Sequence, residues 1–333
     1  MPRHILIDTD TGIDDAVAIA LAARLDALSV IAVTTVHGNS DVARVTRNAR
    51  EVARRVGLQA PVVAGAPAPL KRPAHPARET HGPEGLGYVT PSTAPVDAPD
   101  RAPQTIVDAA ARSPGLTLCC LGPLTNLAHA LQRAPELRDA LGPLYIMGGS
   151  VAVRGTQTRW SEFNWWADPE AVDVVLSADL DVRLVPLDVT RRVAVPGSAI
   201  RELLRAGERD EDARFWGDAL RFYADFHQSY ESFDGCVVND ALAVALVADP
   251  SLAGWREMRI GVSLTDDEWR GAIIVDAPEG ALAHVALEIK ARDVLALIGQ
   301  RVFTPWLAHD ALLPGAADAE RWLAANPLRE ERG

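Results

Sequence analysis

The sequence predicts an α/β protein whose core is a doubly wound, mainly parallel sheet, with extra C-terminal helices and a small antiparallel addition. Three observations support this prediction. Strand-like and helix-like runs alternate up to about residue 200, as expected for successive βαβ units. Several strand-like runs are apolar and β-branched, which is typical of parallel strands covered on both faces. The later pattern is first helical and then extended.

The elements of the first part follow in βαβ order. Strands are expected at residues 5–7, 28–36, 61–65, 115–121, 144–147 and 182–187. Helices are expected after the first strand, around 42–56, after 122–126, and from 168 to about 178. In the last of these, Asp168 is the expected N-cap and Pro169 the first helical residue. Such a Rossmann-like sheet binds ligands beyond the carboxyl ends of its strands.

Two segments complete the chain. Residues 66–103 are rich in Pro and Gly, and loops of this length in compact domains are commonly functional; residues 81–87 are expected to form a mobile lid. Residues 196–248 are expected to be helical, 258–264, 272–275 and 283–289 extended, and 291–307 helical. Because no repeat or linker interrupts the pattern, a single domain over 1–333 is predicted.

Composition limits the classes of partner. The net charge of the 333 residues is −12, and only two of the 33 basic residues are lysines, which argues against nucleic-acid and anionic-membrane partners. No apolar run is long enough to span a membrane, and no signal peptide is recognisable. The three cysteines are expected to be reduced and buried, so the sequence favours a cytoplasmic protein.

The first predicted strand leads into four closely spaced acids, Asp8, Asp10, Asp14 and Asp15. Like charges this close repel one another unless a cation lies between them. Carboxylate oxygens are the preferred ligands of hard divalent cations, so a metal site is predicted, with Asp240 as a distant contributor. The alternatives are an ordinary acidic first turn for Asp14 and Asp15, and a helix N-cap for Asp240.

A second group of polar and aromatic residues lies at 162–168. Glu162, Asn164 and the aromatic side chains of Phe163, Trp165 and Trp166 suit a polyhydroxylated ligand, through hydrogen bonds to hydroxyls and stacking on a ring. The alternative is a loop whose tryptophans cover the core.

Six motifs occur in an order that resembles the inosine-uridine-preferring nucleoside hydrolases: Asp8-Thr-Asp-Thr-Gly-Ile-Asp-Asp-Ala, Thr34-Thr-Val-His-Gly-Asn39, Gly122-Pro-Leu-Thr-Asn126, Met147-Gly-Gly149, Glu162-Phe-Asn164 and Asn239-Asp-Ala-Leu-Ala-Val. The resemblance implies a ribonucleoside substrate and a Ca²⁺ cofactor. Its implied ligands are the Asp10, Asp15 and Asp240 carboxylates and the Leu121 carbonyl. It further implies a subsite near the ion and the ribose, formed by Asp14, Asn39, Met147, Glu162, Phe163 and Asn164.

The implied reaction is hydrolysis of the N-glycosidic bond to ribose and free base. A Ca²⁺-bound water would attack C1′, with Asp10 as its general base. Two positions depart from the family pattern: Asn239 stands where a histidine is usual, and Thr156 where an asparagine often contacts ribose. An amide cannot act as a general acid near neutral pH, so another group must activate the leaving base. The candidates are protonation by His227 or by His81, and stacking of the base on Trp160, Trp165 or Trp166.

Two other functions remain open at this stage. One is a Ca²⁺-dependent ribonucleoside-binding protein with weak or no turnover. The other is a haloacid-dehalogenase-like phosphohydrolase, suggested by Asp8-Thr-Asp10-Thr11; Lys71 and Lys290 are poorly placed in the chain for the lysine that this chemistry needs. The family resemblance also implies a homodimer or homotetramer.

Overall fold

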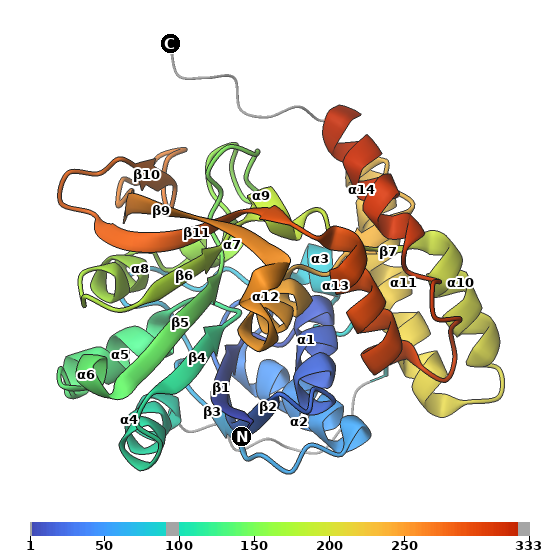
Figure 1. Cartoon of the computed structure of the whole chain (residues 1–333), viewed down its shortest axis with the longest axis horizontal. Coiled ribbons are helices and arrows are strands. Elements are labelled where there is room, and N and C mark those ends of the chain that lie inside the picture. Colours follow the sequence, from blue (N-terminus) through green and yellow to red (C-terminus); the bar gives the residue numbers. More distant parts are fainter. Residues whose placement is uncertain (1, 91–99, 326–333) are drawn as a thin grey trace.

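The computed structural model describes residues 2–90 and 100–325 and confirms the predicted α/β class (Figure 1). The strands of the main sheet are β1 (Arg3–Thr9), β2 (Leu28–Thr35), β3 (Val62–Ala64), β4 (Leu116–Cys120), β5 (Leu141–Met147), β6 (Val182–Val185), β9 (Ala253–Val262), β10 (Ile273–Val275) and β11 (Ala281–Ile289). They lie in the order β10-β9-β11-β6-β5-β4-β1-β2-β3. Strands β1 to β6 and β11 pair in parallel, whereas β9 is antiparallel to both of its neighbours.

Helices cover both faces of this sheet. They are α1 (Ile13–Ala23), α2 (Val42–Val56), α3 (Arg78–His81), α4 (Ala102–Arg112), α5 (Thr125–Arg133), α6 (Leu137–Ala140), α7 (Phe163–Ala167), α8 (Pro169–Leu176), α9 (Leu187–Thr190), α10 (Gly197–Ala206), α11 (Glu211–Glu231), α12 (Asn239–Ala248), α13 (Ala291–Ile298) and α14 (Pro314–Ala325). Helices α1, α12 and α13 share one apolar core, and α4, α5 and α8 share the other. Two buried layers on opposite faces explain why the central strands are apolar throughout.

Local sequence accounts for several helix ends. The Asp41 carboxylate accepts the Arg44 N–H at 3.0 Å and caps α2, which ends at Gly57 in the left-handed conformation. The predicted cap of α8 is confirmed, because the Asp168 carboxylate accepts the Ala171 N–H at 3.1 Å. The N-cap alternative for Asp240 is wrong, because α12 begins at Asn239 and its N-cap is Val238.

The predicted antiparallel addition is confirmed: β9 is antiparallel to β10 and to β11, and β11 lies beside β6, which joins these strands to the main sheet. The helices predicted for the second half differ from the structure in two ways. The helical stretch 196–248 is interrupted by β8 (Gly235–Val237), which pairs with β7 (Ala194–Pro196) in a two-stranded antiparallel sheet. The last predicted helix ends at Ile298 and continues as a π-helix, Gly299–Phe303, before α14. Strands of three residues are too short for the hydrophobic period to reveal them.

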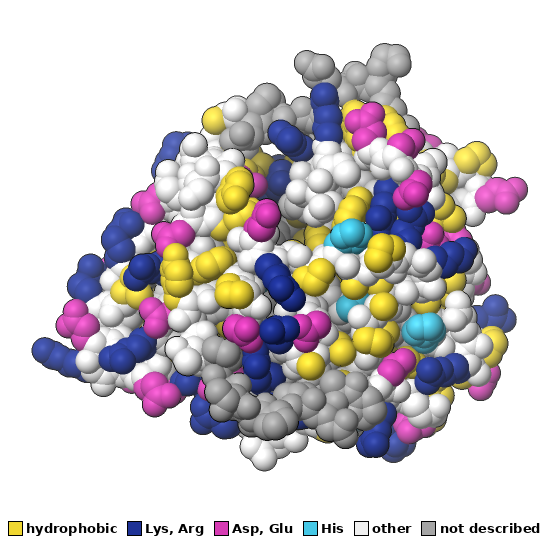
Figure 2. All heavy atoms as spheres, turned by 180° about the vertical axis from the view of Figure 1, so that it is seen from behind, with side chains coloured by type: hydrophobic (Ala, Val, Ile, Leu, Met, Phe, Trp, Pro, Cys, Tyr) yellow, Lys and Arg dark blue, Asp and Glu magenta, His cyan; other side chains and the backbone are white. Residues whose placement is uncertain are grey.

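The loop predicted over 66–103 contains the short helix α3, which places His81 inside the protein. Residues 91–99 of this loop lie outside the described residues. Residues 81–87 are described, and their mobility as a lid stays a prediction. No helix among the described residues combines the length and the apolar character that a membrane span requires. Figure 2 shows acidic and basic side chains intermingled over one face of the molecule.

The order of the parallel strands changes direction between β1 and β4, because β2 and β3 lie on one side and β5 and β6 on the other. Open α/β sheets bind ligands at such a point, where the loops after two adjacent strands diverge and leave a crevice. Asp10 follows β1 and Leu121 follows β4, so the acidic motif opens directly onto this crevice.

Candidate active site

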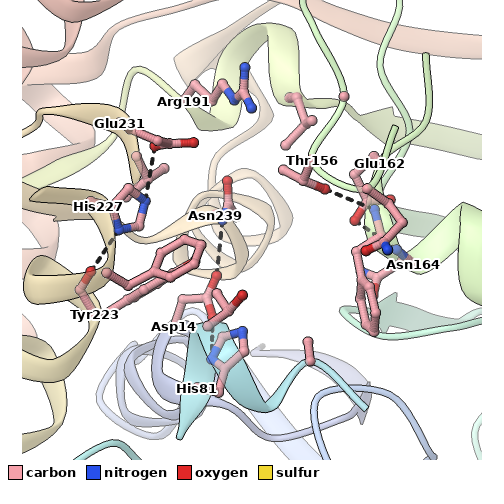
Figure 3. Close-up of a pocket in the computed structure, with 18 of the residues that line it drawn as sticks. Asp14, His81, Thr156, Glu162, Asn164, Arg191, Tyr223, His227, Glu231 and Asn239 are labelled. Atoms are coloured by element: carbon pink, nitrogen blue, oxygen red, sulfur yellow. Dashed lines mark hydrogen bonds and ion pairs between the residues drawn. The ribbon is translucent and has the colours of Figure 1, made fainter. Parts of the chain in front are cut away.

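A cavity of about 740 Å³ lies at this position (Figure 3). Most of the residues predicted from the motifs line it: Asp10, Asp14, Asn39, His81, Leu121, Met147, Thr156, Glu162, Phe163, Asn164, His227, Asn239 and Asp240. They come from β5, from the loops after β1, β2, β4 and β5, from α1, α3, α7 and α11, and from the start of α12. Residues up to about 230 positions apart in the chain thus face one space.

Three buried carboxylates cluster at the floor of the cavity; Asp14 and Asp240 line it, whereas Asp15 is fully buried and does not. Asp14, Asp15 and Asp240 each place an oxygen within 4.8 Å of the other two, so this cluster could hold a metal ion. Burial is the main reason that the pKa values of Asp14 and Asp15 are raised to about 6. Burial and the neighbouring acids also raise the pKa of Asp240 well above its ordinary value. A divalent cation would relieve both penalties.

Asp10 lies beside this cluster without being one of its three members. Its Oδ2 accepts the backbone N–H of Asn39 at 2.8 Å, while burial and the charge of Asp15 raise its pKa. A Cβ on Gly38 would lie 2.0 Å from the same oxygen, so only glycine allows this close approach. The geometric cluster therefore contains Asp14 in the place where the sequence prediction had Asp10.

Three hydrogen-bond donors orient the Asp15 carboxylate. This carboxylate accepts hydrogen bonds from the Thr9 hydroxyl, from the Gly12 N–H at 2.8 Å, and from the Asn39 side-chain amide at 3.1 Å. The Gly12 contact also completes the N-terminus of α1, because it satisfies a backbone donor that has no partner within the helix. The hydrogen bond between Gly12 and Asp15 thus stabilises the start of α1 and also orients the Asp15 carboxylate.

The opposite wall is built around α7. Glu162 caps this helix: its carboxylate accepts the N–H groups of Asn164 at 2.7 Å, Trp165 at 3.2 Å and Gly149 at 2.9 Å. Burial nevertheless raises the pKa of Glu162 to about 7. The Asn164 amide donates to the Leu121 carbonyl at 2.7 Å, which joins α7 to the end of β4.

Two further polar groups complete this wall. The Thr156 hydroxyl accepts the Phe163 N–H at 3.0 Å and keeps its own proton available for a ligand. The Leu121 carbonyl keeps a second lone pair in addition to the one that accepts from Asn164.

Asn239 links Asp14, at the floor of the cavity, to Thr190, the last residue of α9. Its amide nitrogen donates to Asp14 Oδ2 at 3.1 Å, and its oxygen accepts the buried Thr190 hydroxyl at 2.8 Å. Because an ionised carboxylate only accepts hydrogen bonds, the Asn239 amide nitrogen must face Asp14, and the amide oxygen then accepts the Thr190 hydroxyl. This chain therefore uses the position as a hydrogen-bond donor to Asp14.

Both candidate histidines reach the cavity and are buried. His81 lies 4.0 Å from Asp14 and accepts the Ile13 N–H at 3.2 Å; burial lowers its pKa to about 4. His227 donates from Nδ1 to the Tyr223 carbonyl at 2.8 Å, and its Nε2 lies 3.7 Å from Glu231. Burial also lowers the pKa of His227, although the Glu231 charge opposes this shift.

The three candidate tryptophans do not line the cavity. Trp160 stacks on Trp269 with ring centroids 4.1 Å apart. Trp165 is fully buried beneath the Gly148–Gly149 turn, and the Trp166 ring packs against the Arg270 guanidinium at 4.1 Å. Their structural role matches the alternative in which the tryptophans of this loop cover the core.

Sequence reasoning missed an aromatic wall on α11. Tyr223, Phe226 and Tyr230 join His227 along one side of this helix and line the cavity. Their spacing of three and four residues places them on one helical face, and this pattern around His227 was the available signal. Arg191, just after α9, and Trp322, on α14, also line the cavity, and no motif in the sequence marks them.

Comparisons with known proteins identify one family over most of the chain. The family model described as inosine-uridine preferring nucleoside hydrolase matches residues 5–296. The inosine-uridine preferring nucleoside hydrolase of Crithidia fasciculata is 34% identical over 299 residues, which cover 87% of this chain and 94% of that protein. The pyrimidine-specific ribonucleoside hydrolase RihA of Shewanella woodyi is 34% identical over 319 residues, which cover 91% and 99%, respectively.

A solved structure extends the similarity to the fold. The purine-preferring ribonucleoside hydrolase from Gardnerella vaginalis superimposes with a TM-score of 0.83 at 25% identity, covering 96% of this chain and 100% of that one. These relatives are named for different bases, so the similarity indicates a common reaction and leaves the preferred base open.

Proposed function

We propose a calcium-dependent mechanism for this chain, which belongs to the inosine-uridine preferring nucleoside hydrolase family. The chain hydrolyses ribonucleosides to ribose and free base. In the proposed mechanism, Asp10, Asp15, Asp240 and the Leu121 carbonyl hold the ion, and Asp14, Asn39, Met147, Thr156, Glu162, Phe163 and Asn164 bind the ribose.

The observation that best supports this proposal is the buried acidic floor. No arginine or lysine of the described residues forms an ion pair with Asp10, Asp14, Asp15 or Asp240; their only such contact is His81, 4.0 Å from Asp14. Uncompensated buried carboxylates are costly, whereas carboxylate and carbonyl oxygens together are the ligands that Ca²⁺ prefers. When bound, calcium would neutralise these acids, orient the ribose hydroxyls and make a nearby water more acidic.

The residues of the chain would then act on substrate and water. Asp10 takes a proton from the attacking water, which forms a bond to C1′ as the C1′–N bond breaks. Positive charge develops on the sugar ring, and the surrounding carboxylates stabilise it. Asn239 holds Asp14 in position through the hydrogen bond described above, so that the Asp14 carboxylate faces the ribose.

Release of ribose tests this proposal. Inosine and uridine are incubated with the protein in Ca²⁺ and in excess chelator, and reducing sugar is measured. We expect turnover in Ca²⁺, its loss in chelator, and a decrease of about 10²- to 10⁴-fold in kcat for Asp10→Asn. Binding of nucleoside without release of ribose, or turnover that survives chelation, would contradict the mechanism. Release of phosphate from phosphomonoesters would instead favour a phosphohydrolase.

Three broader properties are proposed with it. The shared cores around the nine-stranded sheet support a single domain. Three free, buried cysteines support a cytoplasmic location. Exposed apolar side chains on β10 and β11 (Ile274, Val275 and Leu282) support a homodimer or homotetramer, which sedimentation in solution would test.

A further inference from the structure

The guanidinium group of Arg191 is a cation for which the described residues supply no hydrogen bond. Arg191 follows the last residue of α9, and only 9% of its surface is exposed. Among the described residues, no hydrogen bond or ion pair reaches its guanidinium group. Its closest defined contact is the Trp322 ring, whose centroid lies 5.3 Å from the guanidinium carbon. Arg191 lines the cavity, and its guanidinium nitrogens are open to this space rather than sealed in the core, so its five N–H donors are available to a ligand.

The charges around Arg191 do not supply acceptors for these donors. Glu231 and Asp188 favour its charged form from a distance, whereas burial and the charge of Arg154 disfavour it. The Asp188 carboxylate accepts the backbone N–H groups of Val151 and Ala152 at 2.8 and 2.7 Å, and Glu231 lies 3.7 Å from His227. Arg154 and Arg159 also line this cavity, as do Glu79 and Glu231. An arginine whose donors face a cavity favours a ligand that carries acceptors or negative charge beside it.

The position of Arg191 relates it to the departing base. It is the chain neighbour of Thr190, whose hydroxyl binds Asn239. In Figure 3 its guanidinium lies beyond Asn239, on the side of the cavity away from Asp14 and His81. If the ribose binds at the acidic floor, the base extends from C1′ towards this opposite side. Arg191 would thus face the base at the end of the cavity opposite the acidic floor, with Glu231 on the same side.

We propose that Arg191 binds acceptor atoms of the leaving base and stabilises the negative charge that develops on it as the glycosidic bond breaks. This inference rests on the proposed function. The electron pair of the C1′–N bond stays with the base nitrogen, while the water oxygen bonds to C1′ and its proton passes to Asp10. The base departs as an anion held by the guanidinium, and then takes up one proton, so that water is consumed and base and ribose are formed. Arg191 thereby performs electrostatically what a general acid would do by protonation.

A neighbouring residue shows the alternative, purely structural use of an arginine. Arg192 donates from Nε to the Asp188 carbonyl at 3.2 Å and does not line the cavity. It is adjacent in sequence and has the same chemistry, so Arg192→Gln is a matched control for loss of an arginine in this segment.

The test compares substrates that differ in their need for leaving-group stabilisation. Arg191→Gln, Arg191→Lys and Arg192→Gln are assayed in Ca²⁺ with the faster of inosine and uridine, and with p-nitrophenyl β-D-ribofuranoside, whose nitrophenolate leaves without assistance. We expect Arg191→Gln to lower kcat for the nucleoside about 100-fold, comparable with loss of one oxyanion donor, and for the nitrophenyl riboside less than threefold. Arg191→Lys should recover part of the nucleoside rate, and Arg192→Gln should match wild type.

Each outcome is decisive. Equal losses on both substrates would identify a structural role and overturn the inference, as would an unchanged nucleoside rate in Arg191→Gln. Thermal unfolding identifies a variant that fails to fold, and the Arg191→Lys result then decides: a larger loss on the nucleoside than on the nitrophenyl riboside supports the inference. If wild type releases ribose from no substrate, the proposed function itself fails, and the inference fails with it.

Discussion

Replacement of Asp240 by asparagine should reverse the order of stability between the calcium-free and calcium-bound states. Its carboxylate lies within 4.8 Å of those of Asp14 and Asp15. Two unit charges at this distance repel by about 3 kcal/mol at an effective dielectric constant of ~20. Partial protonation lowers this cost at neutral pH, so we expect Asp240→Asn to stabilise the calcium-free protein by about 2 kcal/mol, or about 4 °C in Tm.

In the presence of calcium, the Asp240→Asn variant should instead be less stable than wild type. At a concentration about 100 times its Kd, a ligand that binds only the folded state stabilises a protein by about 2.7 kcal/mol. Asp240→Asn removes one charged ligand from the site and should lose most of this gain. The variant is then more stable than wild type in chelator and less stable in millimolar Ca²⁺.

Thermal unfolding of both proteins in chelator and in Ca²⁺ measures this reversal. Asp218→Asn, a half-buried aspartate on α11 away from the cavity, is the control and should leave both Tm values unchanged. The reasoning is refuted if Asp240→Asn is less stable than wild type in chelator, or if calcium raises the Tm of the variant as much as that of wild type.

Two further predictions concern Thr190 and His37. Thr190→Val leaves the Asn239 oxygen without its donor and frees Asn239 from Asp14, so kcat/KM for inosine should fall about tenfold, corresponding to ~1.4 kcal/mol. Thr46→Val, which removes a buried hydroxyl from α2, is the control and should lower stability while leaving kcat/KM unchanged. Burial lowers the pKa of His37 from 6.5 to about 4, so the unfolded chain binds more protons between these values. Its contribution to stability is therefore complete above pH 6.5 and is lost as pH falls towards 4, by roughly 2–3 kcal/mol. His37→Gln should flatten this part of the curve of unfolding free energy against pH, and an unchanged slope would contradict the assignment.

The sequence alone determined the α/β class, most strands and the acidic motif. These features are local: hydrophobic period identifies an element from a few consecutive residues, and Asp10 to Asp15 are close in space because they are close in the chain. The family pattern also pointed to Glu162 and Asn164, and both line the cavity. Sequence period could not reveal that β9 to β11 extend the main sheet, because strand partners are chosen by tertiary packing.

Tertiary structure decided the parts of the site that lie far apart in the chain. Only the meeting of α1 with α12 makes Asn239 a donor to Asp14, 225 residues earlier. The tryptophans expected near the substrate pack into the core and against other side chains, whereas Arg191 and the aromatic face of α11 reach the cavity. The period of a helix or strand shows which residues share a face, but which surface that face meets depends on how the whole chain packs. The sequence therefore specified the acidic end of the cavity, where we propose that the sugar binds, and folding supplied the end that we propose faces the base.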